Sequence, residues 1–508
     1  MFSTVQSATL HGLSVEMIDV EADVSNGLPM FHLVGYLSSE VKEAGERVRT
    51  AIRNSGYLLP AKKIVVNLSP ADKRKRGTLF DLPIAAAVLM ALGEIPKTSL
   101  ENTLLVGELS LDGTIKSVIG VLPIVIAAQK KGCKCCIVPK ENLEEASLVA
   151  EIQVIGVSNL QEVCEILKGN RKAIYSCKSN KKALETGYAM DYSEIKGQYL
   201  PKRAVEIAVA GNHNLLMVGP PGAGKTAIAK RMPTILPPLT KDDCMELTMI
   251  YSIMGELNTE KPLIEHRPFR EVHQTISKAG LIGGGVLPKP GEITLANKGI
   301  LFLDEIAEFK RDVLETLRQP MEEHRIKFMR ERGEYEFPAE FLLVAAMNPC
   351  PCGYHPDRNR CQCSEPQIQK YLNQISQPLL DRIDLCIEVT KVPYEALINQ
   401  TEEESSEEIR NRVMKARAVQ KIRYQDMGIQ TNSQLNIKQI EEICVLNDEG
   451  KMMMEQAFKQ LGLTARTYHK VLCVARTIAD LAGEEQIEAR HLREALSYRS
   501  MSSKYWRK

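Results

Sequence analysis

The segment GPPGAGKT, from Gly219 to Thr226, fits the pattern G-x-x-x-x-G-K-[ST]. An apolar strand-like segment, NLLMV, precedes it, and the helix-compatible AIAKRM follows it. Between a strand and a helix, such a loop lets backbone N–H groups converge on phosphate oxygens. We expect Lys225 to reach the β- and γ-phosphates of a nucleotide and Thr226 to help hold Mg²⁺. The other residues of the predicted phosphate loop are Gly219, Pro220, Pro221, Gly222, Ala223 and Gly224.

Polar residues end the next two apolar segments that read as buried strands. Asp304 and Glu305 follow the segment 300–303, and Asn348 ends FLLVAAMN. Ligands bind at the carboxyl ends of strands in parallel sheets. We expect Asp304 to act on the metal through its water shell, Glu305 to orient the attacking water, and Asn348 to sense the γ-phosphate. Alone, Glu305 is equally consistent with an acidic helix start, and Asn348 before a proline with a turn.

Four cysteines form two Cys-x-Cys pairs, Cys350 with Cys352 and Cys361 with Cys363. The chain has 13 cysteines in all, and a reducing compartment keeps most such thiols free. Zinc favours four thiolates in a tetrahedron, so the cluster predicts a structural Zn²⁺ site, with His355 as a spare ligand. The spacing differs from the usual Cys-x-x-Cys. Free thiols and redox-labile pairs are the alternatives.

These residues need an α/β fold to position them. Residues 1–168 alternate short strands, such as 64–68 and 104–111, with amphipathic helices, and predict a separate α/β domain. The polar, aperiodic segment 169–196 suits a linker. Residues 197–392 form a second α/β region, and 393–508 are helical, with a capping box predicted at Ser405 and Glu408.

The composition and the apolar runs limit which kinds of partner the chain can bind. The formal net charge is +1, so binding to nucleic acid or to a membrane would need a local basic patch. The N-terminus lacks the basic and apolar regions of a signal peptide. The longest apolar runs are shorter than the roughly 20 residues of a membrane helix. We therefore expect a cytoplasmic protein with no membrane partner.

The motifs GPPGAGKT, LFLDE, AAMNP, LLDRIDL and LTART occur in this order and resemble those of AAA+ ATPases. The resemblance is to the branch that contains magnesium chelatase and the MCM helicases. It implies a P-loop AAA+ core with a parallel sheet, a helical lid, and ATP with Mg²⁺ as cofactors. It also makes Arg382 an arginine finger that reaches a neighbour's site and Arg466 the second sensor. A finger acting on a neighbour implies a ring, most often a homo-hexamer. From the residues alone, Arg382 between two aspartates is equally consistent with a surface ion pair.

Two further segments match that branch. Residues 271–292 resemble its insertion, with Gly283 to Gly285 as a flexible tip. Residues 325–338 alternate around Arg-Gly-Glu and predict a β-hairpin that resembles the one pointing into the ring channel. Lys327, Arg330 and Arg332 would then contact a DNA backbone. A solvated edge hairpin, its charge balanced by glutamates, is the alternative, with Glu331, Glu334 and Glu336 as the acidic residues.

The N-terminal region resembles the proteolytic domain of Lon, without its Ser–Lys dyad. The nucleophile segment reads Gly77 to Asp81, GTLFD, where Thr78 is a weak substitute, and no lysine follows Gly120. A nucleophile without a base is inactive, so we expect a structural or nucleic-acid-binding domain. The basic run Lys73 to Arg76 would face DNA or form a solvated loop. The whole arrangement resembles the YifB/ComM family, also labelled magnesium chelatase-like.

These observations predict a ring-forming ATPase motor acting on single-stranded or branched DNA, as a helicase in branch migration, recombination or natural transformation. A magnesium chelatase motor subunit is one alternative, although that subunit lacks a Lon-like domain. An ATP-driven protein remodeller and a nucleotide-gated scaffold are the others. The scaffold is disfavoured because the whole catalytic series is present.

Overall fold

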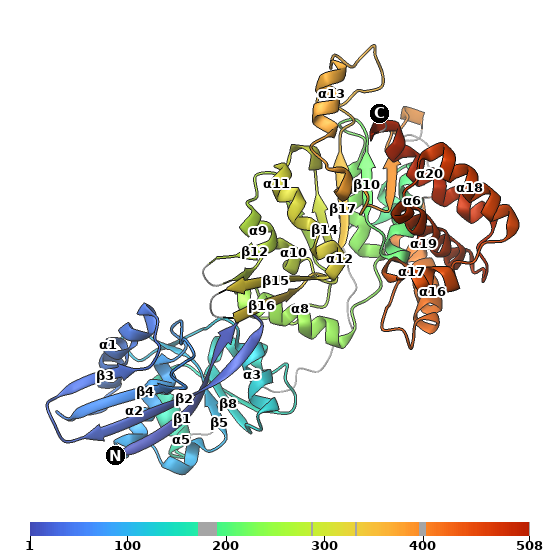
Figure 1. Cartoon of the computed structure of the whole chain (residues 1–508). Helices are drawn as coiled ribbons and strands as arrows, with labels where there is room; N and C mark the ends of the chain where they lie inside the picture. Colours follow the sequence, from blue (N-terminus) through green and yellow to red (C-terminus); the bar gives the residue numbers. More distant parts are fainter. Residues whose placement is uncertain (171–189, 286–287, 331–332, 396–402, 507–508) are drawn as a thin grey trace. The chain divides into compact units, whose positions relative to one another are not determined.

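The computed structural model describes residues 1–170, 190–285, 288–330, 333–395 and 403–506 (Figure 1). The chain divides into two compact units. The first contains residues 1–184, 241–265 and 329–336, and the second contains 185–240, 266–328 and 337–508. No helix in the described ranges has both the length and the apolar character needed to cross a membrane.

The first unit is built on one sheet in the order β3-β4-β2-β1-β5-β8-β9. The long strands β1 and β2 pair antiparallel around a turn at Gly12, and β2 pairs antiparallel with β4. The other neighbours in the sheet are parallel. The strands are β1 (Phe2–His11), β2 (Ser14–Ser25), β3 (Met30–Val34), β4 (Lys63–Ser69), β5 (Thr103–Leu105), β8 (Cys135–Pro139) and β9 (Gln153–Val157).

Helices lie between the strands of this unit, as the alternating sequence pattern predicts. α2 (Asp81–Ala91) is buried along its whole length against β1 and β2. Asn159 caps α5 by accepting from the N–H of Glu162. The predicted strand 104–111 is wrong as one element. It breaks into β5 and β6 (Glu108–Leu109) at Gly107, whose N–H bonds to Leu79. The other helices here are α1 (Ser39–Asn54), α3 (Val121–Lys130), α4 (Leu143–Ala146) and α5 (Leu160–Leu167), and β7 (Ile115–Lys116) pairs with β6.

Two segments that we assigned to the second α/β region belong to the first unit. In α8 (Lys241–Met254), the carbonyl of Ser252 accepts from the N–H of Gly120 at 3.1 Å, and its hydroxyl bonds to Glu145. In residues 329–336, Tyr335 stacks on His11 with ring centroids 4.1 Å apart. Packing between segments distant in the sequence therefore overrides the predicted boundary at residue 197.

The second unit contains a parallel sheet in the order β11-β14-β17-β10-β18. Its inner strands are buried throughout, as expected for a sheet covered on both faces. Their carboxyl ends carry the phosphate loop, Asp304 and Asn348. The strands are β10 (Leu215–Val218), β11 (Phe269–Val272), β14 (Ile300–Leu303), β17 (Leu342–Met347) and β18 (Leu385–Glu388).

Helices of the lid gather on one flank of this sheet (Figure 1). The predicted capping box forms between Ser405 and Glu408 at the start of α16. The lid helices are α16 (Ser406–Arg423), α17 (Ile437–Ile443), α18 (Asp448–Leu461), α19 (Ala465–Ala482) and α20 (Ala489–Trp506). The core adds α6 (Tyr199–Gly211), α7 (Lys225–Arg231), α10 (Glu292–Leu295), α11 (Arg311–Leu314), α12 (Pro320–Glu323), α13 (Glu365–Leu372) and α14 (Gln377–Leu380).

The predicted linker ends earlier than residue 196. Residues 171–189 lie outside the described ranges, but Tyr192 is fully buried, and its hydroxyl donates to the carbonyl of Ile228 at 2.8 Å. The carbonyl of Asp191 accepts from Arg231 at 2.8 Å. The residues just before α6 are therefore part of the core.

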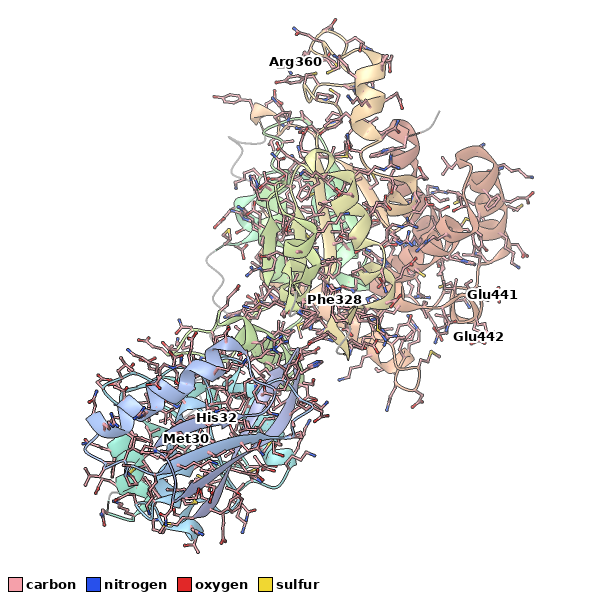
Figure 2. All side chains as sticks on the ribbon, turned by 60° about the vertical axis from the view of Figure 1, so that its left-hand side comes forward. Met30, His32, Phe328, Arg360, Glu441 and Glu442 are labelled. Carbon is pink, nitrogen blue, oxygen red and sulfur yellow. The ribbon has the colours of Figure 1, made fainter. Side chains whose placement is uncertain are left out.

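The predicted hairpin at 325–338 is confirmed as β15 (Arg325–Arg330) and β16 (Gly333–Pro338). Phe328, labelled in Figure 2, packs edge-on against Phe337 with centroids 6.1 Å apart. In the predicted insertion, α9 (Lys278–Ile282) leads into β12 (Gly283–Gly284), which pairs with β13 (Lys289–Pro290). Gly283 and Gly284 thus form a short strand instead of the expected tip, and residues 286–287 lie outside the described ranges.

Candidate nucleotide-binding site

The phosphate loop joins β10 to α7, and its glycines fit their positions. A Cβ on Gly219 would lie 2.1 Å from the carbonyl oxygen of Val389, so only glycine permits this approach. Gly222 and Gly224 have φ values of 74° and 91°, which favour glycine. A Cβ on either would meet no atom within 4 Å. The loop therefore packs tightly against the core at Gly219 and leaves open space at Gly222 and Gly224.

Lys225 lies where the loop meets the end of β17. Its ammonium group donates to the carbonyls of Gly219 at 2.6 Å and Pro220 at 3.1 Å, and to the side-chain oxygen of Asn348 at 3.2 Å. Burial lowers the pKa of Lys225, while Asp304 and Glu305 oppose that shift. A cation held by neutral carbonyl oxygens is well placed to exchange them for phosphate oxygens.

Thr226 and the acidic pair lie together at the start of α7 and the end of β14. The hydroxyl of Thr226 donates to Asp304 at 2.7 Å. Glu305 is exposed and adopts the left-handed conformation, with φ of 52°, and its N–H donates to Asp304 at 3.0 Å. Such a backbone is costly for a non-glycine residue and is found preferentially at functional sites. A hydroxyl and a carboxylate are oxygen ligands of the kind that Mg²⁺ prefers.

A pocket of about 200 Å³ opens beside the phosphate loop, and sequence reasoning missed it. Its walls include Ile195, Gln198 and Val392, together with Ala223 and Gly224 of the loop. The amide group of Gln198 donates to the carbonyls of Ala223 at 3.2 Å and Thr390 at 2.7 Å, tying the two sides together. Three charged residues, Glu194, Lys196 and Arg231, also line it. A pocket of mixed apolar and polar walls beside a phosphate loop suits a nucleoside. Its walls come from distant segments, so no local pattern reveals it.

The two predicted arginines share one acidic partner, Glu322. Arg382 is 7% exposed and donates to Glu322 at 2.7 Å, so the surface ion pair with a neighbouring aspartate is wrong. Arg466 also donates to Glu322. Burial raises the pKa of Glu322, but hydrogen bonds from the two guanidinium groups outweigh it and hold that pKa below its usual range. Arg466 is therefore grouped with Arg382, and the contacts of the described residues do not join it to Lys225.

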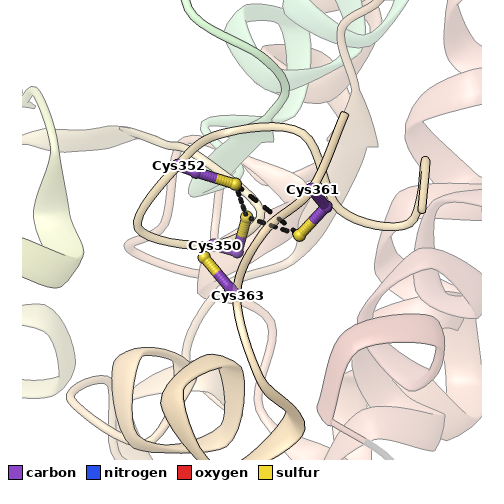
Figure 3. A group of neighbouring side chains, drawn as sticks. All are labelled: Cys350, Cys352, Cys361 and Cys363. Atoms are coloured by element: carbon purple, nitrogen blue, oxygen red, sulfur yellow. Dashed lines mark hydrogen bonds between the residues drawn. The ribbon is translucent and has the colours of Figure 1, made fainter. Parts of the chain in front are cut away.

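The four cysteines after Asn348 come together. Their sulfur atoms all lie within 4.8 Å of one another. Figure 3 shows the four thiols pointing toward a common centre. The predicted spare ligand His355 is not in this group; its N–H donates to the sulfur of Cys350 at 3.4 Å. Arg360, labelled in Figure 2, lies over the ring of Tyr354 at 5.0 Å.

Two basic segments were predicted to face DNA, the hairpin at 325–338 and the run from Lys73 to Arg76. Lys327 and Arg330 lie on β15, while Arg332 and Glu331 are outside the described ranges. The basic run of the first unit does not form a continuous basic surface. Lys75 is fully buried and donates to the carbonyl of Pro70, and Lys73 pairs with Glu16 at 2.7 Å.

The Lon-like region contains no trace of a Ser–Lys pair at the positions described. Thr78 donates its hydroxyl proton to Glu108, and the nearby Asp81 is buried and paired with Arg47 at 2.9 Å. Burial raises the pKa of Asp81 even though the hydrogen bond from Arg47 opposes the shift. The hydroxyl of this threonine therefore faces a carboxylate, whereas the nucleophile of the protease faces an amine base.

Three family models match the chain. Residues 191–397 match "Magnesium chelatase, subunit ChlI", residues 20–142 match "Subunit ChlI of Mg-chelatase", and residues 403–499 match "Magnesium chelatase, subunit ChlI C-terminal". The sequence is 33% identical over 130 residues to Lon protease 2 of Bacillus subtilis, which covers 25% of this chain and 23% of that protein.

Two relatives match nearly the whole chain. Competence protein ComM of Haemophilus influenzae is 43% identical over 502 residues, which covers 98% of this chain and 97% of that protein. YifB of Escherichia coli K12 is 41% identical over 501 residues, with the same coverage of both chains. With the phosphate loop, the acidic pair and Asn348 on one parallel sheet, the chain belongs to the YifB/ComM family of magnesium chelatase-like AAA+ proteins.

Proposed function

We propose that the protein is an ATP- and Mg²⁺-dependent ring motor that acts on DNA in the cytoplasm. One observation carries the ATPase part: Lys225 bonds to Asn348, and Thr226 bonds to Asp304, at the ends of three adjacent strands. In this proposal Lys225 binds the phosphates, and Thr226 and Asp304 hold Mg²⁺. Glu305 orients the water that attacks the γ-phosphate. The pocket at Ile195 and Gln198 takes the nucleoside, and a structural zinc ion at the cysteine cluster is the third cofactor.

The ring follows from the arginines. Because Glu322 holds Arg382 and Arg466 together, we propose that both act on one nucleotide, which is bound by the neighbouring subunit. A guanidinium group stabilises the charge that spreads over the γ-phosphate during transfer. A site completed by the next subunit requires a closed assembly, and the homo-hexamer is the expected one.

The DNA part rests on the hairpin and on a relative. β15 carries Lys327 and Arg330. Cationic side chains on a hairpin suit the phosphate backbone of DNA. The relative from Haemophilus influenzae is named a competence protein. Together these support DNA, single-stranded or branched, as the substrate, with unwinding or branch migration as the activity.

The test is the ATPase rate of the purified full-length chain with and without single-stranded and forked DNA, at low and moderate salt. The proposal predicts a several-fold stimulation that fades as salt rises, because phosphate contacts release counterions. A rate that no DNA changes would exclude DNA as the substrate. It would leave an ATPase that remodels a protein or acts on a small molecule.

A chelatase subunit is the second candidate. The Lon-like N-terminal domain of this chain argues against a chelatase subunit on sequence grounds. However, a model described as "Subunit ChlI of Mg-chelatase" matches residues 20–142 as well. The N-terminal domain therefore does not exclude it. Absorbance of protoporphyrin with Mg²⁺, ATP and this protein distinguishes the two, since a motor acting on DNA leaves the porphyrin spectrum unchanged.

A further inference from the structure

The sulfur atoms of the cysteine cluster are spaced as ligands of one metal ion. The sulfur of Cys350 lies 3.3 Å from that of Cys352 and 3.7 Å from that of Cys361, and the last two are 3.6 Å apart. Zinc–sulfur bonds of about 2.3 Å in a tetrahedron place the sulfurs about 3.8 Å apart. Cys363 completes the set within the 4.8 Å limit (Figure 3).

The loop that carries these cysteines has no apolar core of its own. Between Cys350 and Cys363, the buried residues are Cys350, Gly353 and Cys361, while the segment from Pro356 to Arg360 is exposed. Backbone turns shape it, with the N–H of Gly353 on the carbonyl of Cys350 at 2.9 Å. A loop without buried apolar side chains gains its rigidity from a cross-link, and a metal with four thiolates supplies one.

This loop lies directly on the phosphate loop. Gly353 has φ of 83°, and a Cβ there would lie 2.4 Å from Cδ and 2.8 Å from Cγ of Pro221. Pro221 is the third residue of GPPGAGKT. Cys350 also follows Asn348 by two residues, and Asn348 accepts from Lys225. The cysteine loop therefore contacts the phosphate loop at Pro221 and continues the strand that ends at the γ-phosphate sensor.

We propose that the four thiolates bind one Zn²⁺ and that this ion holds the phosphate loop in its nucleotide-binding geometry, so that nucleotide affinity depends on metal loading. The inference rests on the proposed ATP site. Binding replaces four S–H protons, released to solvent, by four Zn–S bonds, without electron transfer. The N–H of His355 supplies the kind of hydrogen bond that orients a metal-bound thiolate.

The test compares three variants with wild type, all full-length and purified under reducing conditions. Cys352→Ser combined with Cys363→Ser removes two ligands. Gly353→Ala keeps every ligand but inserts a methyl group against Pro221. Cys135→Ser, on β8 of the first unit, is the control. Elemental analysis gives zinc per chain, and titration with a fluorescent ATP analogue and Mg²⁺ gives affinity.

We expect one zinc per chain in wild type, Gly353→Ala and Cys135→Ser, and none in the double variant. Affinity should fall about tenfold in the double variant and in Gly353→Ala, the equivalent of one or two lost hydrogen bonds, and stay unchanged in Cys135→Ser. Wild type without zinc, with affinity that a chelator leaves unchanged, would overturn the metal site. Normal affinity in Gly353→Ala, or in a folded double variant without zinc, would overturn the contact role. Zinc-loaded wild type that binds no nucleotide would instead refute the proposed function.

Discussion

In the proposed mechanism, Lys225 serves nucleotide binding and Glu305 serves hydrolysis. Lys225 is buried, and its ammonium group donates to neutral oxygen atoms of the phosphate loop and of Asn348. Glu305 is exposed at the strand end, and a costly backbone conformation holds it there. The first residue is thus placed for a phosphate and the second for a water molecule.

Lys225→Ala should abolish ATP binding, because it removes the cation that the phosphates require. Glu305→Gln should bind ATP normally but hydrolyse it about 10²-fold more slowly or worse, the range of a lost general base. Nucleotide titration and single-turnover hydrolysis measure the two effects. Wild-type turnover in Glu305→Gln would show that the water is activated elsewhere.

Arg382→Ala should keep nucleotide affinity and lose hydrolysis by about 10³-fold, as for arginine fingers elsewhere. Mixing it with Lys225→Ala tests whether the finger acts on a neighbour. Each variant alone should be inactive. In mixed rings, the intact nucleotide site of an Arg382→Ala subunit can face the intact arginine of a Lys225→Ala subunit. Recovery of ATPase on mixing is therefore expected, and no recovery would place Arg382 in its own subunit's site.

The strands and the loop that carry the site could be predicted from the sequence, because short sequence patterns specify them. A buried apolar strand followed by a glycine loop and a helix fixes the phosphate loop, and the same strand pattern places Asp304 and Asn348. β1 and β2 were missed as long strands because small polar residues, Ser3 and Ser7, take inward positions on β1. The nucleoside pocket and the role of Glu322 depend on contacts between distant segments, which no local pattern encodes.

The turn before α6 connects the nucleoside pocket to the lid through Asp191. Its carboxylate accepts from the N–H of Ser193 at 2.8 Å and from that of Ser406 at 3.1 Å. Asp191→Ala leaves these donors without a partner and should cost about 1–3 kcal/mol of unfolding free energy. Nucleotide affinity should also fall, because the turn that Asp191 holds in place carries Ile195, which lines the pocket. Chemical denaturation measures the first effect.

Asp448→Ala is the matched control for Asp191→Ala, since Asp448 is exposed at the start of α18. It should be close to neutral. Equal stability losses in the two variants would show that the Asp191 contacts contribute nothing of their own.

The contact between His213, two residues after α6, and α19 should make stability depend on pH. His213 is fully buried and bonds to Thr477 at 2.8 Å, and burial lowers its pKa to about 4. Below about pH 6.5 this histidine becomes protonated in the unfolded chain but stays neutral in the folded chain. Its contribution to the free energy of unfolding is therefore complete above that pH and is lost as pH falls toward 4. It should be about 2 kcal/mol smaller at pH 5 than at pH 7.5.

Denaturation of wild type and His213→Gln at both pH values isolates that contribution. The variant should show a smaller pH dependence, whereas His32→Gln, on the exposed strand β3 (Figure 2), should match wild type. A pH dependence identical in wild type and His213→Gln would mean that other groups cause it.

At the scale of the whole molecule, the proposed ATP hydrolysis requires an assembly larger than one chain. The chain of 56.7 kDa holds both a nucleotide site and the two arginines that we propose to serve a neighbour. Glu305→Gln with ATP and Mg²⁺ should therefore sediment at about six times the mass of the chain, because uncleaved nucleotide keeps the interfaces closed. A monomer under these conditions would contradict the ring.

Displacement of a labelled strand from forked DNA would show directly whether the protein is a DNA motor. Wild type should separate the strands only with ATP and Mg²⁺, and Glu305→Gln should bind the fork without separating it. Lys225→Ala should do neither with added ATP. A wild-type protein that hydrolyses ATP steadily, yet neither binds the fork nor displaces its strand at low salt, would contradict a motor acting on DNA.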